Sequence, residues 1–296
     1  MPRNDVSVII PTLALRERGT LLRRALASVR SQDGVRAVPI VVVNGNAAHA
    51  ETIESLSRDK RVTVVRQEAA DLPAALRLGR SLVTTRWFAT LDDDDVLLPG
   101  ALAARCNALA EPDGFDTVVT NGYRRSGLES TLHVPDMREV ARDPLGALMS
   151  YNWLLPGAWM CATDASSERL FEAMPRHLEC TYLAIRLSTD RKVRFLNVPT
   201  VAWATDTPGS ASKSRGYRLG QAAAILRLLE LEVPPPLRAH LRNRLAAARH
   251  EAARIAFVEG NTRQAWLQQI RSLQHPQGWG HLAFTFRLAA GWRQKD

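Results

Sequence analysis

Residues 6–91 alternate short apolar runs with amphipathic helical segments, and this alternation limits the possible folds more than any other feature. Near-continuous apolar strands that alternate with helices are typical of a parallel sheet, whose ligands bind at the carboxyl ends of the strands. The pattern therefore predicts an α/β fold with a Rossmann-like, mostly parallel sheet and helices on both faces. The expected strands are 6–12, 38–43, 62–65 and 86–91, and the expected helices are 21–29, one through 53–56, and 72–82.

A different pattern follows these elements. We expect a helix at 101–109 and two further strands at 117–119 and 193–196. Between these strands lies a less regular middle region, about residues 122–178. From Tyr217 onward, apolar residues recur at helical spacing in three segments, with Pro234-Pro235-Pro236 as a stop between the first two. The sequence thus predicts an α/β domain at 1–212 and a helical C-terminal region at 213–296.

Four consecutive aspartates, Asp92 to Asp95, follow the expected strand at 86–91. Carboxylates about 6 Å apart repel by roughly 3 kcal/mol at an effective dielectric constant of 20, so their clustering favours a bound cation. Asp92 and Asp94 project to the same side if strand geometry persists, and two hard oxygen ligands suit Mg²⁺ or Mn²⁺. The remaining metal ligands would then come from elsewhere, such as substrate phosphates. The alternative is a solvated acidic turn that caps the next helix.

The composition of the chain, 296 residues of which 46% are hydrophobic, is that of a soluble protein with a substantial core. We find no secretory signal at the N-terminus and no run of about 18 apolar residues that would span a membrane. Three cysteines, Cys106, Cys161 and Cys180, lack the CxxC spacing of a zinc site and argue against a disulfide framework. A reducing cytoplasm is the expected location.

The net charge of +9 is confined to the C-terminal region. Residues 1–212 carry 25 basic and 25 acidic side chains, whereas residues 213–296 carry 14 and 5. A basic appendage points to an anionic membrane surface or a polyanionic acceptor, and no nucleic-acid module is recognisable. A solvated helical face is the alternative. The last segment, Trp279–Trp292, is patterned like an interfacial membrane helix, although a helix docked on the core would look the same.

Over about residues 5–212 the chain resembles the family 2 glycosyltransferases of GT-A fold. In that family a strand ends in Asp-x-Asp-Asp, followed by an apolar pair and a proline, and Leu91–Pro99 matches this order. Val-Ile-Ile-Pro-Thr at 8–12, the turn at 41–46 and the segment 178–187 also match. The resemblance implies a GT-A-type domain that transfers a sugar from a nucleotide-sugar donor with inversion.

The resemblance also implies a set of phosphate and metal contacts. Asp94, with Asp92, would bind Mg²⁺ or Mn²⁺, through which the donor diphosphate is held. Asp93 or Asp92 would face the ribose. The family's Ala-Arg-Asn segment is replaced here by Ala-Leu-Arg-Leu-Gly, which leaves Arg77 or Arg80 to meet the diphosphate.

A base pocket follows from the same resemblance. The backbone of Pro11 and Thr12 would line it, and Asn44 stands where the family usually has an aspartate that contacts the base. The Asn44 carbonyl can still accept a hydrogen bond from a uracil or thymine N–H. The alternative is that Asn44-Gly45 only forms a strand-end turn, for which this pair is favoured.

The general base of the family belongs to a Glu-Asp pair, which reads Glu179-Cys180 here. A thiol has the wrong pKa and little reason to ionise, so Glu179 is the candidate catalytic residue. Asp206 is the nearest alternative, and a salt bridge of Glu179 with Arg186 or His177 is the competing interpretation. Other matches, in a region that closes over donor or acceptor in the family, are Arg186, Asp206 and Ser210–Ser212.

The implied activity is that of a hexosyltransferase using a UDP- or dTDP-sugar, with a glycan or lipid-linked acceptor, in surface polysaccharide or glycoconjugate synthesis. The expected location is cytoplasmic or peripheral at the inner face of the cell membrane, and no nucleic acid is an expected partner. Two alternatives stay open. One is a sugar-phosphate nucleotidyltransferase, although residues 12–16 are not its Gly- and Lys-rich phosphate loop. The other is a GT-A-like nucleotide-binding or scaffold protein that has lost its base.

Overall fold

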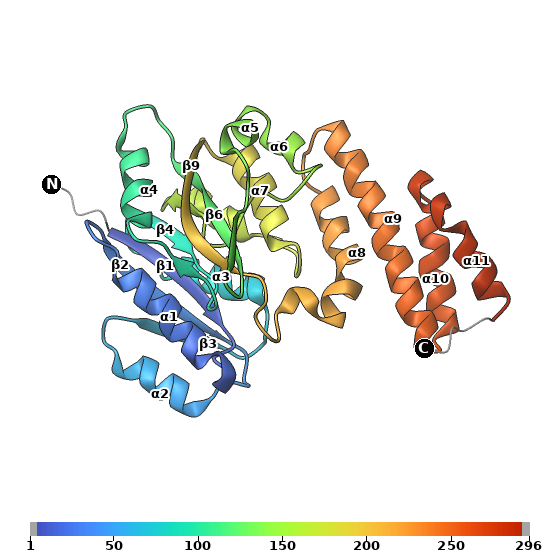
Figure 1. Cartoon of the computed structure of the whole chain (residues 1–296), viewed down its shortest axis with the longest axis horizontal. Coiled ribbons are helices and arrows are strands. Elements are labelled where there is room, and N and C mark those ends of the chain that lie inside the picture. Colours follow the sequence, from blue (N-terminus) through green and yellow to red (C-terminus); the bar gives the residue numbers. More distant parts are fainter. Residues whose placement is uncertain (1–4, 292–296) are drawn as a thin grey trace. The chain divides into compact units, whose positions relative to one another are not determined.

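The computed structural model describes residues 5–291, which form two compact units (Figure 1). The first unit consists of residues 5–174 with 179–207, and the second of residues 175–178 with 208–291. All strands of the described residues belong to the first unit, and the second is helical. The functional division at residue 212 stays a prediction.

The N-terminal part of the sheet is parallel, as the strand–helix alternation predicts. β1 pairs in parallel with both β2 and β4, and β2 pairs in parallel with β3. The elements are β1 (Asp5–Thr12), η1 (Arg16–Arg18), α1 (Gly19–Arg30), β2 (Arg36–Asn44), α2 (Ala50–Arg58), β3 (Thr63–Gln67), α3 (Leu72–Ser81) and β4 (Trp87–Thr90). Because these strands are parallel, their carboxyl ends, Thr12, Asn44 and Thr90, lie at one edge of the sheet.

Helices cover both faces of the parallel strands. Leu22 and Leu26 of α1 are buried against Val8 and its neighbours on one face. α3 packs on the other face, where a Cβ placed on Gly79 would lie 2.4 Å from Cγ2 of Ile9. Only glycine permits this close approach. Each fully buried aliphatic side chain at these contacts contributes about 1.5–3 kcal/mol, so the core is assembled around the strands that end at the aspartates.

The rest of the sheet is mixed. Its strand order is β3-β2-β1-β4-β8-β6-β9-β5, with β7 paired to β6. The elements are β5 (Val96–Leu97), α4 (Ala101–Ala110), β6 (Thr117–Ser126), β7 (Glu129–Leu132), α5 (Met137–Arg142), α6 (Pro144–Ala147), β8 (Trp159–Ala162), η2 (Ala165–Phe171), α7 (Glu179–Asp190) and β9 (Val193–Ala204). β8 lies antiparallel between β4 and β6, so the middle region at 122–178 supplies a central strand. A four-residue apolar run is too short for its periodicity to indicate a strand.

The second unit contains the three helices expected after Tyr217. They are preceded by η3 and followed by two short elements: η3 (Ala211–Lys213), α8 (Arg215–Leu229), α9 (Pro235–Val258), α10 (Thr262–Leu273), η4 (Pro276–His281) and α11 (Leu282–Ala289). The segment 279–292 is therefore not one continuous helix, and Trp292 lies outside the described residues. Leu288 is buried with Phe257, so α11 docks on the unit's own core. None of the described helices combines the length and the apolar character needed to cross a membrane.

Candidate functional site

The four aspartates form a tight turn at the carboxyl end of β4. The Leu91 N–H still donates to the carbonyl oxygen of Ile9 at 2.9 Å, and the Asp95 N–H then donates back to the carbonyl oxygen of Asp92 at 3.1 Å. The strand geometry therefore does not continue through the cluster. Burial nevertheless alternates, because Asp93 and Asp95 are buried while Asp92 and Asp94 keep partly exposed side chains. The two predicted metal ligands are thus the two members that solvent reaches.

Asp93 is held from two sides by residues of the chain. The Thr12 hydroxyl donates to its Oδ2 at 2.5 Å, and Arg18 Nε donates to its Oδ1 and Oδ2 at 3.2 and 3.1 Å. Arg18 also ion-pairs with Asp94 at 3.3 Å, and these carboxylates raise its pKa above the ordinary value. Both oxygens of Asp93 are therefore engaged, and its contact with a ribose stays a prediction.

Asp95 connects the turn to β9. Its Oδ1 accepts a hydrogen bond from the Ala204 N–H at 2.9 Å, and the side chain has no exposed surface. Burial, followed by the charge of Asp92, raises its pKa well above the ordinary value. No role was predicted for Asp95 or Arg18. Asp95 could have been noticed, because it is the last aspartate of the Asp-x-Asp-Asp motif. Nothing in the sequence distinguishes Arg18 from the other arginines of residues 16–24.

Asp92 and Glu179 interact electrostatically, although they are far apart in the sequence. The pKa of Asp92 is raised to about 7 by desolvation first, then by the charges of Asp94, Asp93 and Glu179. Glu179 is the first residue of α7, where the helix dipole favours a carboxylate. The structure therefore brings the predicted base and a predicted metal ligand into one acidic site.

Cys180 lies in the same site. Burial, and then the charges of Asp92 and Glu179, raise the pKa of its thiol well above the ordinary value. The thiol is therefore protonated at neutral pH, which agrees with its dismissal as a base. The two residues before Glu179 have left-handed backbone, with φ of 72° at His177 and 57° at Leu178. Non-glycine residues in this conformation cost on the order of 1 kcal/mol each and often lie next to functional groups.

The acidic site suits a divalent cation. Arg18 is the only cationic side chain that forms an ion pair with these aspartates within residues 5–291. Burial first, and then the charges of the neighbouring carboxylates, raise the pKa of Asp92. Asp92 and Asp94 offer hard carboxylate oxygens of the kind that Mg²⁺ and Mn²⁺ take. No group of three or more potential metal-binding side chains occurs in the part of the chain that the structure describes. Asp92 and Asp94 would supply two protein ligands to such an ion, and a diphosphate and water would supply the others.

The predicted base-pocket residues lie at the ends of β1 and β2, as expected. Asn44 Oδ1 accepts from the Asp71 N–H at 2.7 Å and from Gln67 Nε2 at 2.6 Å. The oxygen proposed to meet a base N–H thus already orders the start of α3. Pro11 and Thr12 are buried at the end of β1. Asn44 therefore has a structural role in joining β2 to Gln67 and Asp71, and its contact with a base stays a prediction.

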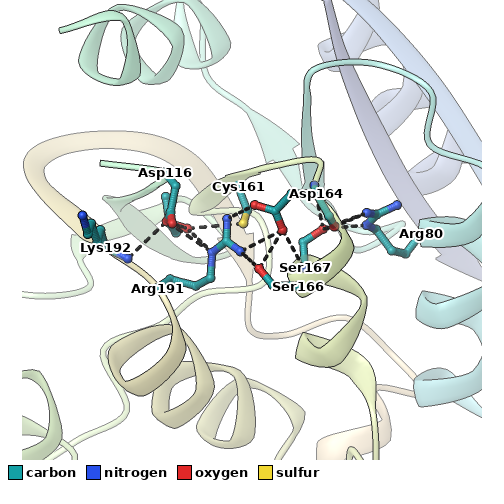
Figure 2. A network of polar contacts seen from close by, with 9 residues as sticks. Arg80, Asp116, Cys161, Asp164, Ser166, Ser167, Arg191 and Lys192 are labelled. Atoms are coloured by element: carbon teal, nitrogen blue, oxygen red, sulfur yellow. Dashed lines mark hydrogen bonds and ion pairs between the residues drawn. The ribbon is translucent and has the colours of Figure 1, made fainter. Parts of the chain in front are cut away.

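The two arginines considered for the diphosphate differ sharply. Arg77 is exposed on α3, and its phosphate contact stays a prediction. Arg80 is buried and points away from solvent, donating to the Ser167 hydroxyl at 2.7 Å and to the Asp164 carbonyl oxygen at 2.9 Å (Figure 2). Arg191 extends this network to Asp164 (Figure 2). Arg80 therefore ties α3 to η2 and is not available to a diphosphate in this arrangement.

Other matched residues also have structural partners. Arg186 ion-pairs with Asp190 at 2.6 Å. Asp206 is exposed, and its Oδ2 accepts from the Gly127 N–H in the β6–β7 turn at 2.7 Å. Ser210 and Ser212 belong to the second unit, where their hydroxyls are 3.0 Å apart. These contacts do not test a role in substrate binding.

A mixed α/β sheet with an acidic turn after its fourth strand has the architecture of a GT-A-type glycosyltransferase. The chain belongs to glycosyl transferase family 2, whose sequence profile matches residues 7–163. No curated protein sequence matches the chain.

Solved structures show the same fold. The chain is similar to S. aureus TarS 1–349 in complex with UDP-GlcNAc, with a TM-score of 0.60, 14% identity, and 92% of this chain and 81% of that chain covered. It is also similar to TarS 1–349 in complex with UDP, with a TM-score of 0.51, 13% identity, and 83% and 71% covered. At this identity the likeness concerns the fold.

Proposed function

We propose that this chain is an inverting glycosyltransferase that moves a sugar from a UDP- or dTDP-sugar to a hydroxyl group of a glycan or lipid-linked acceptor. The observation that carries the proposal is the acidic site itself, where Asp92 and Asp94 are partly exposed and Glu179 interacts with Asp92. The UDP-GlcNAc and UDP complexes of TarS support a uridine nucleotide as the first donor to examine.

Donor binding is assigned to the edge where β1, β2 and β4 end. Asp92 and Asp94 would hold Mg²⁺ or Mn²⁺, which supplies positive charge to the leaving diphosphate. Asp93, fixed by Thr12 and Arg18, keeps the turn in place. Arg77, exposed on the neighbouring α3, is the candidate for an additional phosphate contact.

Glu179 is the proposed general base. It accepts the proton of the acceptor hydroxyl, whose oxygen bonds to the anomeric carbon as the bond from that carbon to the diphosphate oxygen breaks. Attack opposite the leaving group inverts the anomeric centre and needs no covalent enzyme intermediate. Such a base typically contributes about 10²–10⁴-fold to the rate.

The second unit is proposed to dock on an anionic membrane surface. Trp279 lies in η4, whereas Leu282 and Phe286 lie in α11, and the three residues are 67%, 46% and 73% exposed, respectively. Arg287 lies in the same helix as Leu282 and Phe286, and residues 213–296 hold all of the chain's net positive charge. Exposed aromatic and aliphatic side chains beside basic ones are the composition of an interfacial helix.

A product assay tests the proposed activity. The full chain is incubated with UDP-GlcNAc and other UDP- and dTDP-sugars, Mn²⁺ and bacterial cell-surface saccharides, and the products are separated. A glycosyltransferase releases the nucleoside diphosphate and yields a glycoside of inverted anomeric configuration. A nucleotidyltransferase would instead turn over pyrophosphate, and a degenerate scaffold would bind UDP without releasing product.

A further inference from the structure

Six residues in or directly after three neighbouring strands line a hollow of about 330 Å³ in the first unit, which we call the β7-β6-β9 platform: Arg124, Ser126, Glu129, Thr131, Trp203 and Thr205. The strand register explains why they gather. Thr131 pairs with Arg124, and Arg124 pairs with Trp203, which gives one row across the three strands. Figure 1 shows β6 and β9 side by side at this position.

A second row lies two residues further along each strand. Glu129 pairs with Ser126, and the Thr205 N–H, directly after β9, donates to the carbonyl oxygen of Arg125 at 2.9 Å. Side chains two residues apart on a strand point to the same face. Both rows therefore present their side chains on one face of the sheet. This explains why the six residues form one surface although they are far apart in the sequence.

The chemistry of this face selects among ligands. The Arg124 guanidinium lies over the Trp203 ring, 5.4 Å from its centroid, and Arg124, Glu129 and Thr131 are exposed. One guanidinium, one carboxylate and three hydroxyl groups surround an indole, so the formal charges cancel. A phosphate would meet the Glu129 carboxylate, and a wholly apolar ligand would leave the polar groups unpaired. Saccharide hydroxyls both donate and accept hydrogen bonds, so they match both the guanidinium and the carboxylate of this face.

The platform is joined to the acidic site through β9. Ala204 lies between Trp203 and Thr205, and its N–H donates to Asp95 Oδ1 at 2.9 Å. Ala202 also pairs with Val96, directly after the aspartates. At its outer end, Asp206 fixes the β6–β7 turn by accepting from the Gly127 N–H. The strand that carries the indole is therefore anchored to the turn that carries the proposed metal ligands.

We propose that the β7-β6-β9 platform binds the saccharide of the acceptor, with Arg124 and Glu129 as its hydrogen-bonding groups. The inference rests on the proposed function, because it names a substrate subsite of the same enzyme. A hollow of about 330 Å³ is at the lower end of the roughly 300–1,000 Å³ usual for small-molecule sites, which suits a short saccharide segment.

The test uses the full chain on an array of bacterial cell-surface saccharides. The platform variant is Arg124→Met with Glu129→Gln, and the matched control is Arg58→Met with Glu54→Gln, an exposed Arg–Glu pair on α2. Thr131→Val is a second, uncharged platform variant. We expect the wild-type chain and the control to retain the same saccharides. Each platform variant should lose at least about tenfold in retention, because each removes a hydrogen bond to the saccharide.

Binding of UDP with Mn²⁺, measured on the same proteins, separates the two claims. Unchanged UDP affinity in both platform variants shows that the lost retention is local to the platform. Equal saccharide retention by wild type and both platform variants, or no retained saccharide at all alongside normal UDP binding, overturns the platform and leaves the proposed function standing. Absence of UDP binding by the wild-type chain would instead overturn the proposed function, and with it the platform's role.

Discussion

Arg18 Nε donates to both carboxylate oxygens of Asp93, at 3.2 and 3.1 Å, and both side chains are largely shielded from solvent. The pair divides the four aspartates into two kinds. Asp93 and Asp95 are anchors, the first to Arg18 and the second to β9, while Asp92 and Asp94 keep partly exposed side chains. The anchors hold together carboxylates that would otherwise repel one another.

Arg18→Met should destabilise the fold by about 3 kcal/mol, because it leaves the buried Asp93 carboxylate without its cation. The free energy of unfolding, measured in urea at neutral pH with EDTA present, checks this value. Arg58→Met is the control, since Arg58 pairs with Glu54 at an exposed position and should change the same quantity by less than about 1 kcal/mol. Equal effects of the two substitutions would show that Arg18 is not an anchor.

Glu179→Gln should lower turnover at least about 100-fold while UDP affinity stays within a few-fold, because the amide keeps the shape of the carboxylate but accepts no proton. Asp206→Asn should retain transfer, since Asp206 caps the β6–β7 turn and is exposed. Cys180→Ala should be nearly silent. Single-turnover rates with a fixed donor and acceptor compare the three. If Glu179→Gln retains full transfer while Asp206→Asn is inactive, Asp206 rather than Glu179 is the general base.

The parallel half of the sheet could be predicted from the sequence because each strand and helix there carries its own periodicity. The acidic cluster could also be predicted, because four consecutive aspartates at the end of an expected strand are visible in the sequence itself. β8 was missed because its position between β4 and β6 is set by long-range pairing, which a four-residue apolar run does not encode locally.

The partners of individual side chains were the least predictable part of the site. Arg18 reaches Asp93 across 75 positions, and Arg80 turns inward to Ser167 across 87. Such contacts depend on where the helices dock, and an arginine looks the same in sequence whether it anchors a turn or faces a ligand. The platform likewise follows from strand register, which links residue 124 to residue 203.

His133 should make the fold sensitive to mild acid. Burial lowers its pKa to about 4, while its Nε2 is 2.9 Å from the Asn152 carbonyl oxygen. The unfolded chain, with a histidine pKa near 6.5, binds the proton first, so stability falls as pH drops from about 6.5 toward 4. The loss should be about 1–2 kcal/mol, because the side chain is only partly buried. The difference between wild type and His133→Gln, followed by urea unfolding from pH 7 to 4.5, should shrink by this amount; a constant difference contradicts it.

Membrane docking predicts co-sedimentation of the full chain with vesicles rich in an anionic phospholipid. Trp279→Ala with Phe286→Ser should weaken partitioning at least about tenfold, and added salt should weaken it further because each basic residue contributes about 1 kcal/mol near such a surface. Leu128→Ser, at a fully exposed position in the β6–β7 turn, is the control. Equal partitioning of all three proteins would mean that the apolar face of the second unit does not bind membranes.

The central claim is that Asp92 and Asp94 hold the donor diphosphate through a divalent ion. Calorimetric titration of UDP into the full chain, with Mn²⁺ and separately with EDTA, tests it most directly. Asp94→Asn is the test variant, and Asp33→Asn, an exposed aspartate after α1, is the control. We expect Mn²⁺ to raise UDP affinity at least about tenfold in wild type and control, and to have no effect on Asp94→Asn, whose free energy of unfolding stays unchanged. Equal UDP affinity of the wild-type chain with Mn²⁺ and with EDTA would contradict the claim.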